Sequence, residues 1–180
     1  MKKYLLAIFI ISAVITASGC TNSGNQTSSV NKTQIYSGSE FTFEYPSNWK
    51  QATSQAINST VSFGDPSSAD ANGNTQVNVV IQKAVKPTGT TLQNYYNATY
   101  AQFMAQNLGF KPVSEGSIVI NGQSGLEIVY KINSTAPKQQ RAIWLQKKNL
   151  IYIILCSAPA SSYGSQQQNF DTIVNSFKLL

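Results

Sequence analysis

The sequence predicts an α+β fold, a three-layer α/β/α sandwich with a largely antiparallel central sheet. From about residue 35 onward, short runs that alternate apolar and polar residues are separated by turn residues, as is typical of strands. Two longer segments, about 91–108 and 162–177, instead carry apolar residues at helical spacing. Residues 150–156 are apolar on both alternating faces, so a strand here belongs in the middle of a sheet covered on both sides. Two helices and such a strand give three layers.

The composition allows one domain with a hydrophobic core, since a chain of 180 residues buries roughly 70% of its unfolded surface. Charged residues make up 11%, against about 25% in typical soluble domains, and Asn, Gln, Ser and Thr supply the polar surface. Without Lys2 and Lys3, which we expect to be removed, the net charge is +4, which does not indicate a nucleic-acid binder. The chain has no His, the commonest general base and metal ligand.

The first 20 residues have the pattern of an export signal. Lys2 and Lys3 precede an apolar stretch, residues 4–17, that is shorter than the roughly 20 residues needed to span a bilayer. The stretch ends in Ala-Ser-Gly-Cys, which resembles a lipobox although Ala17 replaces the usual Leu. We therefore expect Cys20 to become the lipid-modified N-terminus. An ordinary signal peptide or an uncleaved anchor is the alternative.

Residues 21–34 are rich in Thr, Asn, Ser, Gly and Gln, with Val30 as a lone aliphatic residue. They cannot bury enough apolar area to fold, so we expect a flexible tether. The chain would then consist of a signal peptide (1–20), this tether and a folded domain (35–180). A lipid would hold that domain, as a monomer, at the outer face of the cell membrane.

The folded part begins with residues 40–50. Phe41, Phe43 and Tyr45 alternate with polar residues, so a strand here puts three aromatic rings on one face. The proline that follows lacks the N–H needed for a further rung of the ladder. Trp49 then restarts an extended segment that is able to cover the same aromatic face.

Two helices are expected. Thr90 or Thr91 can cap the first, which runs to about Leu108 with Gly109 as its stop. The residues expected to face the sheet are Leu92, Tyr95, Tyr96, Thr99, Tyr100 and Phe103 in this helix, and Tyr163, Phe170, Val174 and Phe177 in a second helix capped by Ser161 or Ser162.

The strands are separated by turn residues. Asn121 and Gly122 form the preferred two-residue hairpin turn, and Lys148 and Asn149 separate the last two strands. After the aromatic strand, we expect further strands at about 57–63, 75–84, 117–120, 126–132, 139–147 and 150–156.

The order of these segments resembles the PsbP family over about residues 35–180. The resemblance is carried by the order and spacing of the motifs together. The motifs are Phe-x-Phe-x-Tyr-Pro-x-x-Trp at 41–49, Val-Ile-Asn-Gly-x-x-Gly at 119–125, a Trp-containing strand at 143–147, an apolar Tyr-containing strand at 150–156 and Val-Asn-Ser-Phe-Lys at 174–178.

The resemblance implies an α/β/α sandwich with an antiparallel sheet. The family includes extrinsic photosystem subunits, prokaryotic lipoproteins and a nuclear-transport factor of the same fold. The N-terminus of this chain is similar to that of the prokaryotic group, and a photosynthetic function does not transfer because fold does not fix function. A His-centred metal site of the photosystem members has no counterpart in a chain without His.

No catalytic constellation is present in the sequence, so we expect no enzyme activity and no cofactor. Cys156 has no imidazole partner and lies in an apolar run, which predicts an inert core thiol. Once Cys20 carries lipid, Cys156 is the only free Cys and no intramolecular disulfide can form. Glu40 and Glu44 share a strand face but are too far apart for a carboxylate dyad, which favours a solvated edge.

One loop offers weak candidates for calcium ligands, since calcium prefers hard oxygen donors. Its Gly is in the wrong position for a calcium loop and no Glu closes it, so a plain connecting loop is the alternative. No other metal site is expected. The candidate ligands are Asp65, Asp70, Asn72 and Asn74.

Four basic residues, Lys138, Arg141, Lys147 and Lys148, surround one predicted hairpin. They could contact lipid phosphates or an acidic partner, or they could keep an edge strand soluble. Tyr95, Tyr96 and Tyr100 could similarly line a pocket or form part of the core.

Five Asn-x-Ser/Thr sequons are candidate glycosylation sites: Asn25, Asn31, Asn58, Asn97 and Asn133.

Two functions fit the sequence. The first is a membrane-tethered, non-enzymatic domain that binds or stabilises a protein partner at the cell surface. The second is a carrier or receptor for a small apolar or lipidic ligand held between the sheet and the aromatic helix. A large apolar cavity beneath Tyr96 and Phe103 would favour the carrier, and a solid core with an exposed apolar patch would favour the partner-binding domain.

Overall fold

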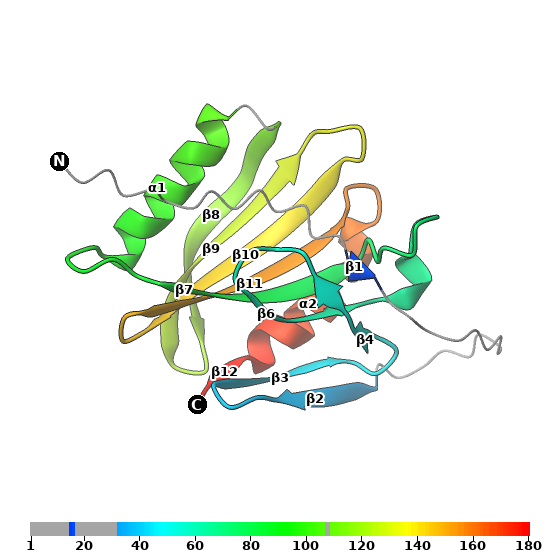
Figure 1. Ribbon diagram of the computed structural model, residues 1–180, viewed down its shortest axis with the longest axis horizontal. Helices are drawn as coiled ribbons and strands as arrows, with labels where there is room; N and C mark the ends of the chain where they lie inside the picture. Colours follow the sequence, from blue (N-terminus) through cyan, green and yellow to red (C-terminus); the bar gives the residue numbers. More distant parts are fainter. Residues whose placement is uncertain (1–14, 17–31, 107–108) are drawn as a thin grey trace.

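The computed structural model of the protein describes residues 15–16, 32–106 and 109–180. Its centre is a seven-stranded antiparallel sheet in the order β4-β6-β7-β11-β10-β9-β8 (Figure 1). The middle strand, β11, is buried from Ile151 to Ala158, as its uninterrupted apolar sequence predicts. The strands are β4 (Lys50–Gln51), β6 (Ser59–Gly64), β7 (Asn78–Val85), β8 (Phe110–Ile120), β9 (Gln123–Ile132), β10 (Lys138–Lys147) and β11 (Leu150–Pro159).

Both faces of this sheet are covered, which confirms the predicted three-layer sandwich. Helix α1 (Leu92–Ala105) packs on one face, and helix α2 (Tyr163–Ser176) packs on the other (Figure 1). The α2 layer also contains a small antiparallel sheet in the order β12-β3-β2, which the sequence did not predict as a separate sheet. Its strands are β2 (Thr33–Ser37), β3 (Phe41–Pro46) and β12 (Lys178–Leu179).

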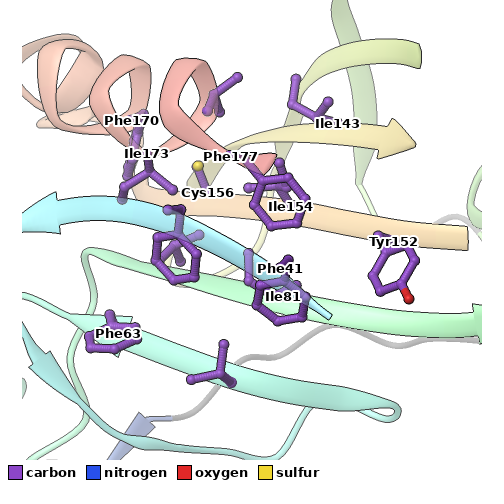
Figure 2. Packing of buried hydrophobic residues seen from close by; sticks show 14 of the residues in the cluster. Phe41, Phe63, Ile81, Ile143, Tyr152, Ile154, Cys156, Phe170, Ile173 and Phe177 are labelled. Atoms are coloured by element: carbon purple, nitrogen blue, oxygen red, sulfur yellow. The ribbon is translucent and has the colours of Figure 1, made fainter. Parts of the chain in front are cut away.

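The aromatic strand β3 contributes to the larger of the two main core clusters. Phe41 and Phe43 are each 1% exposed and stack on Phe177 just after α2, with ring centroids 5.3 and 6.2 Å apart. Trp49 is also buried and joins this cluster against Phe170 of α2. Figure 2 shows Phe41, Phe170 and Phe177 in this interior between β3, α2 and the main sheet.

Helix α1 begins where the sequence predicts and ends earlier. Of the two candidate caps, Thr91 is the N-cap, and its side-chain oxygen accepts a hydrogen bond from the backbone N–H of Asn94. The helix ends at Ala105, although the sequence predicted about Leu108, which lies outside the described residues. Gly109 has a φ of +67° and its carbonyl accepts from the backbone N–H of Asn133, so it starts the β8–β9 hairpin instead of capping the helix.

Two strands differ from the prediction because their outer faces are exposed. Strand β8 begins at Phe110 instead of 117, and its early residues include Pro112 at a bulge, which hides the alternating pattern. Strand β2 was missed because Ile35 is 67% exposed and only Tyr36 packs against the core. Hydrophobic alternation identifies a strand only when one face is buried.

The remaining elements are short. A two-residue strand β1 (Ile15–Thr16) pairs with β5 (Thr53–Ser54), and a 3₁₀ turn, η1 (Pro66–Ser68), lies in the loop before β7.

The predicted hairpin turn is confirmed, with φ of +48° at Asn121 and +79° at Gly122. Within the ranges that the structure describes, neither helix has the length and hydropathy of a membrane span.

Candidate functional site

Beneath α1, the described part of the structure is filled by aromatic side chains. The four aromatic side chains of the predicted stripe, from Tyr95 to Phe103, are each at most 9% exposed. Beneath them, Trp144 Nε1 donates to the Tyr100 hydroxyl over 3.1 Å. The cavity between α1 and the sheet measures only about 10 Å³, close to the minimum for one water molecule. The tyrosine stripe is therefore core, and the pocket that would favour a carrier is missing from this part of the described structure.

The loop of the calcium candidates is organised by its own hydrogen bonds. Asp70 Oδ1 accepts from the backbone N–H groups of Asn72 and Asn74, and Asp70 Oδ2 accepts from Gln76 Nε2. The bond from Asn74 is the main reason that the pKa of Asp70 is lowered. Asp65 Oδ1 likewise accepts from Ser67 N and Oγ at 3.0 and 2.7 Å. In the described ranges no three His, Cys, Asp or Glu side chains gather as metal ligands would, and calcium binding stays a prediction.

The four basic residues of the predicted cluster are not together. Lys138 and Lys147 lie at opposite ends of β10, about 30 Å apart for a ten-residue strand. Burial lowers the pKa of Lys138, and the nearby Asp70 opposes this shift. Lys148, at the far turn, is exposed with a φ of +55°. The hairpin thus offers no single basic patch for lipid phosphates.

The two glutamates of β3 and its preceding turn also act separately. Both carboxylate oxygens of Glu40 accept from Lys83 Nζ, at 3.1 and 2.9 Å. Glu44 accepts from the Thr33 hydroxyl over 2.9 Å. Each carboxylate therefore has its own partner, in agreement with the expectation that they form no dyad.

A concavity bordered by charged side chains lies on the opposite face, between α2 and strands β8, β9 and β10. We call it the α2 groove. Its volume is about 360 Å³, within the range of small-ligand and side-chain pockets. It lies where α2, which packs on the main sheet mainly at β11, leaves part of the inner face of β8 and β9 uncovered. The lining residues are Val113, Ser114, Glu127, Val129, Gln139, Arg141, Tyr163, Gln167, Phe170 and Asp171.

Arg141 is at the centre of the α2 groove, and its side chain is only 15% exposed. Its Nε donates to Glu127 Oε1 and its Nη1 donates to Asp171 Oδ1, and both donor–acceptor distances are 2.6 Å. Burial alone would lower the pKa of Arg141, but the hydrogen bonds that it donates to Asp171 and Glu127 outweigh burial and raise the pKa. One guanidinium thus joins β10, β9 and α2.

Tyr163 and Cys156 border this ion-pair cluster. Tyr163 is 5% exposed, lines the groove, and has a pKa raised mainly by burial. Cys156 is fully buried, and burial raises the pKa of its thiol to about 12. Figure 2 shows Cys156 between the sheet and α2, among Ile154, Ile173 and Phe177. A thiol in this environment is protonated and inaccessible, as the sequence predicts.

The sequence identified Arg141 but not its partners. Glu127 and Asp171 are 44 positions apart, on a strand and a helix, so no local pattern connects them. The available signal was that Arg141 is the single arginine of the chain and lies on a predicted strand. A half-buried arginine requires carboxylate partners, which could have directed attention to the few acidic residues.

The modification sites are partly described. Asn58, Asn97 and Asn133 are exposed, so a glycan at these positions would not disrupt the core. Cys20, Asn25 and Asn31 lie outside the described residues, and lipidation and glycosylation stay predictions.

The architecture defines the class of protein: an α+β sandwich domain with one helix on each face of an antiparallel sheet. The chain belongs to the PsbP-like protein family, whose family model matches residues 5–179. This confirms the resemblance found in the sequence motifs. No curated protein matches the chain.

Several solved structures share the fold. PsbP of the cyanobacterium Synechocystis sp. PCC 6803 is 15% identical with a TM-score of 0.62, and the match covers 88% of this chain and 98% of that one. LpqN of Mycobacterium tuberculosis, described as involved in cell envelope biogenesis, is 12% identical with a TM-score of 0.56, covering 82% and 90%. The Ran-binding protein Mog1p of Saccharomyces cerevisiae is 9% identical with a TM-score of 0.54, covering 82% and 95%. At these identities the likeness shows the fold alone.

Proposed function

We propose that the protein is a lipid-tethered, non-enzymatic protein whose PsbP-like domain binds or stabilises a partner protein at the outer face of the cell membrane. The observation that carries this proposal is the contrast between the two faces of the sheet. The α1 face is filled, with a cavity of about 10 Å³, whereas the α2 face has an open groove of about 360 Å³ that contains charged side chains. A groove of this kind suits side chains of another protein more than an enclosed apolar ligand.

The N-terminal sequence supports the location. A basic start, an apolar stretch and a Cys after small residues are followed by a polar tether, and these parts agree with one another. The fold is also used by LpqN, described as acting in cell envelope biogenesis, and by Mog1p, described as Ran-binding. These descriptions support an envelope location and a protein-binding use of the domain.

The chemistry of the described residues supports a non-enzymatic role. The single described thiol, Cys156, is buried, and its pKa is far above neutral. The carboxylates of the α2 groove hold Arg141 and so are not poised as a general acid and base pair. The second candidate function, a carrier for a small apolar or lipidic ligand, loses support because the cavity beneath Tyr100 and Phe103 is too small for one.

The test is crosslinking in intact membranes followed by affinity capture and mass spectrometry. The control is residues 1–34 fused to an unrelated domain, which has the same signal, Cys20 and tether. We expect a protein that crosslinks to the whole protein in a reproducible ratio and does not crosslink to the control. Equal recovery of every protein by the two tethered chains would refute a specific partner, and a lipid that copurifies in a one-to-one ratio would favour the carrier.

A further inference from the structure

Arg141, Glu127 and Asp171 form a charge cluster in the α2 groove that is not neutral. One guanidinium faces two carboxylates, so the cluster has a net charge of −1 on a chain that is otherwise basic. A further anion would meet two carboxylates and an already paired arginine. A cation would complete the charge balance.

The cluster also has acceptor atoms that the described residues leave unused. Each ion pair uses one oxygen of its carboxylate, and Glu127 Oε2 and Asp171 Oδ2 have no hydrogen-bond partner among the described residues. The Tyr163 hydroxyl, on a side chain that is 95% buried, likewise has no partner in the described ranges. Three oxygen acceptors therefore border one groove.

Apolar groups make up part of the groove wall, beside the polar side chains of Ser114, Gln139 and Gln167. Val113 and Val129 line it on the sheet side, and the rings of Tyr163 and Phe170 line it on the helix side. An ammonium group has three N–H donors at the end of a four-carbon stem. The apolar walls suit the stem, and the three acceptors suit the charged end.

We propose that the α2 groove binds a lysine side chain of the partner protein, with the ammonium group between Glu127 and Asp171 beside Tyr163. This inference rests on the proposed function and names the chemistry of the partner at that site. It also accounts for the position of Arg141, which holds the two carboxylates at the groove and lowers their mutual repulsion.

The exposed edge of β8 is a less suitable docking element at this point. Lys111, Pro112 and the adjacent bulge interrupt the ladder beside the groove, and such features prevent the addition of another strand. We therefore expect the groove to bind the partner through a side chain and not through hydrogen bonds to an added strand.

Because Arg141 is the single arginine, its side-chain Nε–H signal in a ¹⁵N NMR spectrum is assigned without ambiguity. The mature lipidated protein in detergent micelles is titrated with Nα-acetyl-lysine N-methylamide. The control probe has the same structure with its ε-amine acetylated and therefore neutral. We expect the Arg141 signal to shift and saturate with the lysine probe and to stay unchanged with the neutral one.

The variant Asp171→Asn should raise the Kd of the lysine probe about tenfold, since it removes a charged hydrogen-bond acceptor. Asp171 is 54% exposed, so the substitution leaves the core intact. Glu44→Gln, which makes the same change in net charge on β3, should leave the Kd unchanged. Equal Kd values for both probes, or for the wild type and Asp171→Asn, would overturn the proposal.

Membrane crosslinking of the same three proteins separates this inference from the proposed function. Loss of the partner in Asp171→Asn but not in Glu44→Gln supports the groove as the docking site. Full retention of the partner in Asp171→Asn overturns the groove and leaves the proposed function standing. If the wild type captures no partner, the proposed function fails, and the NMR titration alone decides whether the groove binds lysine.

Discussion

Cys156 shows how burial controls chemistry at the scale of one residue. Its side chain is fully buried in the cluster beneath α2, and burial raises the pKa of the thiol to about 12. At pH 8 the group is protonated and unreachable, and the thiolate is the reactive form. We expect a thiol reagent to label no cysteine of the native protein and one per chain in urea, measured by mass. A second labelled cysteine would show that Cys20 is not lipidated.

The same shift makes the stability depend on pH. A raised thiol pKa means that the unfolded state loses its proton first, so the contribution to stability is complete below the unfolded value of 9.0 and is lost between there and about 12. The free energy of unfolding should therefore fall from pH 8 to pH 10 by a larger amount in the wild type than in Cys156→Ala. Urea melts at the two pH values measure it. Identical slopes would show that the thiol ionises equally well in the folded protein.

Phe103 and Asn97 lie on different faces of α1, about 120° apart around the helix axis. Phe103 is 7% exposed against Tyr100 and Phe110, whereas Asn97 is exposed and accepts a hydrogen bond from Gln93. Phe103→Ala should cost about 3–5 kcal/mol of unfolding free energy because it empties a buried aromatic site. Asn97→Gln should cost under about 0.5 kcal/mol, as for a surface change. Urea melts of the two variants measure the difference, and near-equal costs would contradict this orientation of the helix.

At the scale of elements, the β8–β9 turn is tied to the end of α2. Asn121 Nδ2 donates to the backbone carbonyl groups of Asn175 and Phe177, over 3.2 and 2.9 Å, and Asn121 itself has a φ of +48°. Asn121→Gly keeps the turn and loses both bonds, so we expect a cost of about 1 kcal/mol. Asn121→Ala adds the strain of a positive φ, about 1 kcal/mol more. Thermal or urea melts test the order wild type, Gly, Ala, and an Ala variant as stable as the Gly variant would contradict it.

The sequence predicted best the elements whose burial is regular. The central strand and the Asn121-Gly122 turn depend on local chemistry and were found from the sequence, and the helix cap was narrowed to Thr90 or Thr91, of which Thr91 is the cap. Strand β2 and the first half of β8 were not found, because their side chains face water on most positions. Their positions are set by backbone pairing with the neighbouring strands β3 and β9, and this pairing leaves no apolar alternation in the sequence when most side chains are exposed.

The candidate site was less predictable than the fold for the same reason. Tyr163 was correctly placed on the inner face of the last helix, and Arg141 was noted as basic. Their common location depends on where α2 packs over β10 and β11, which is a tertiary property. Periodicity in the sequence shows which side of a helix or strand is buried, but it does not show which other element packs against that side.

At the scale of the whole molecule, the fold separates a filled side from an open side. The α1 layer closes one face of the sheet with aromatic rings, and the α2 layer leaves the inner surface of β8 and β9 accessible. A domain of this design has a rigid scaffold for a surface site, and the flexible tether expected between Cys20 and strand β2 would let that surface reach a partner beside the membrane.

The location of the molecule depends on Cys20, and this gives the last prediction. If the thiol of Cys20 carries lipid, then Cys20→Ala removes the anchor, and we expect the domain from residue 35 onward to keep its fold. Two apolar acyl chains hold a protein stably at a membrane, whereas a soluble domain without them is released. We expect Cys20→Ala to move from the membrane pellet to the soluble or secreted fraction with an unaltered urea melt. Ser18→Ala, which leaves the cysteine in place, is the matched control and should stay in the pellet. If Cys20→Ala stays in the membrane with Lys2 and Lys3 still attached, residues 4–17 are an uncleaved anchor and the lipid is not what holds the domain.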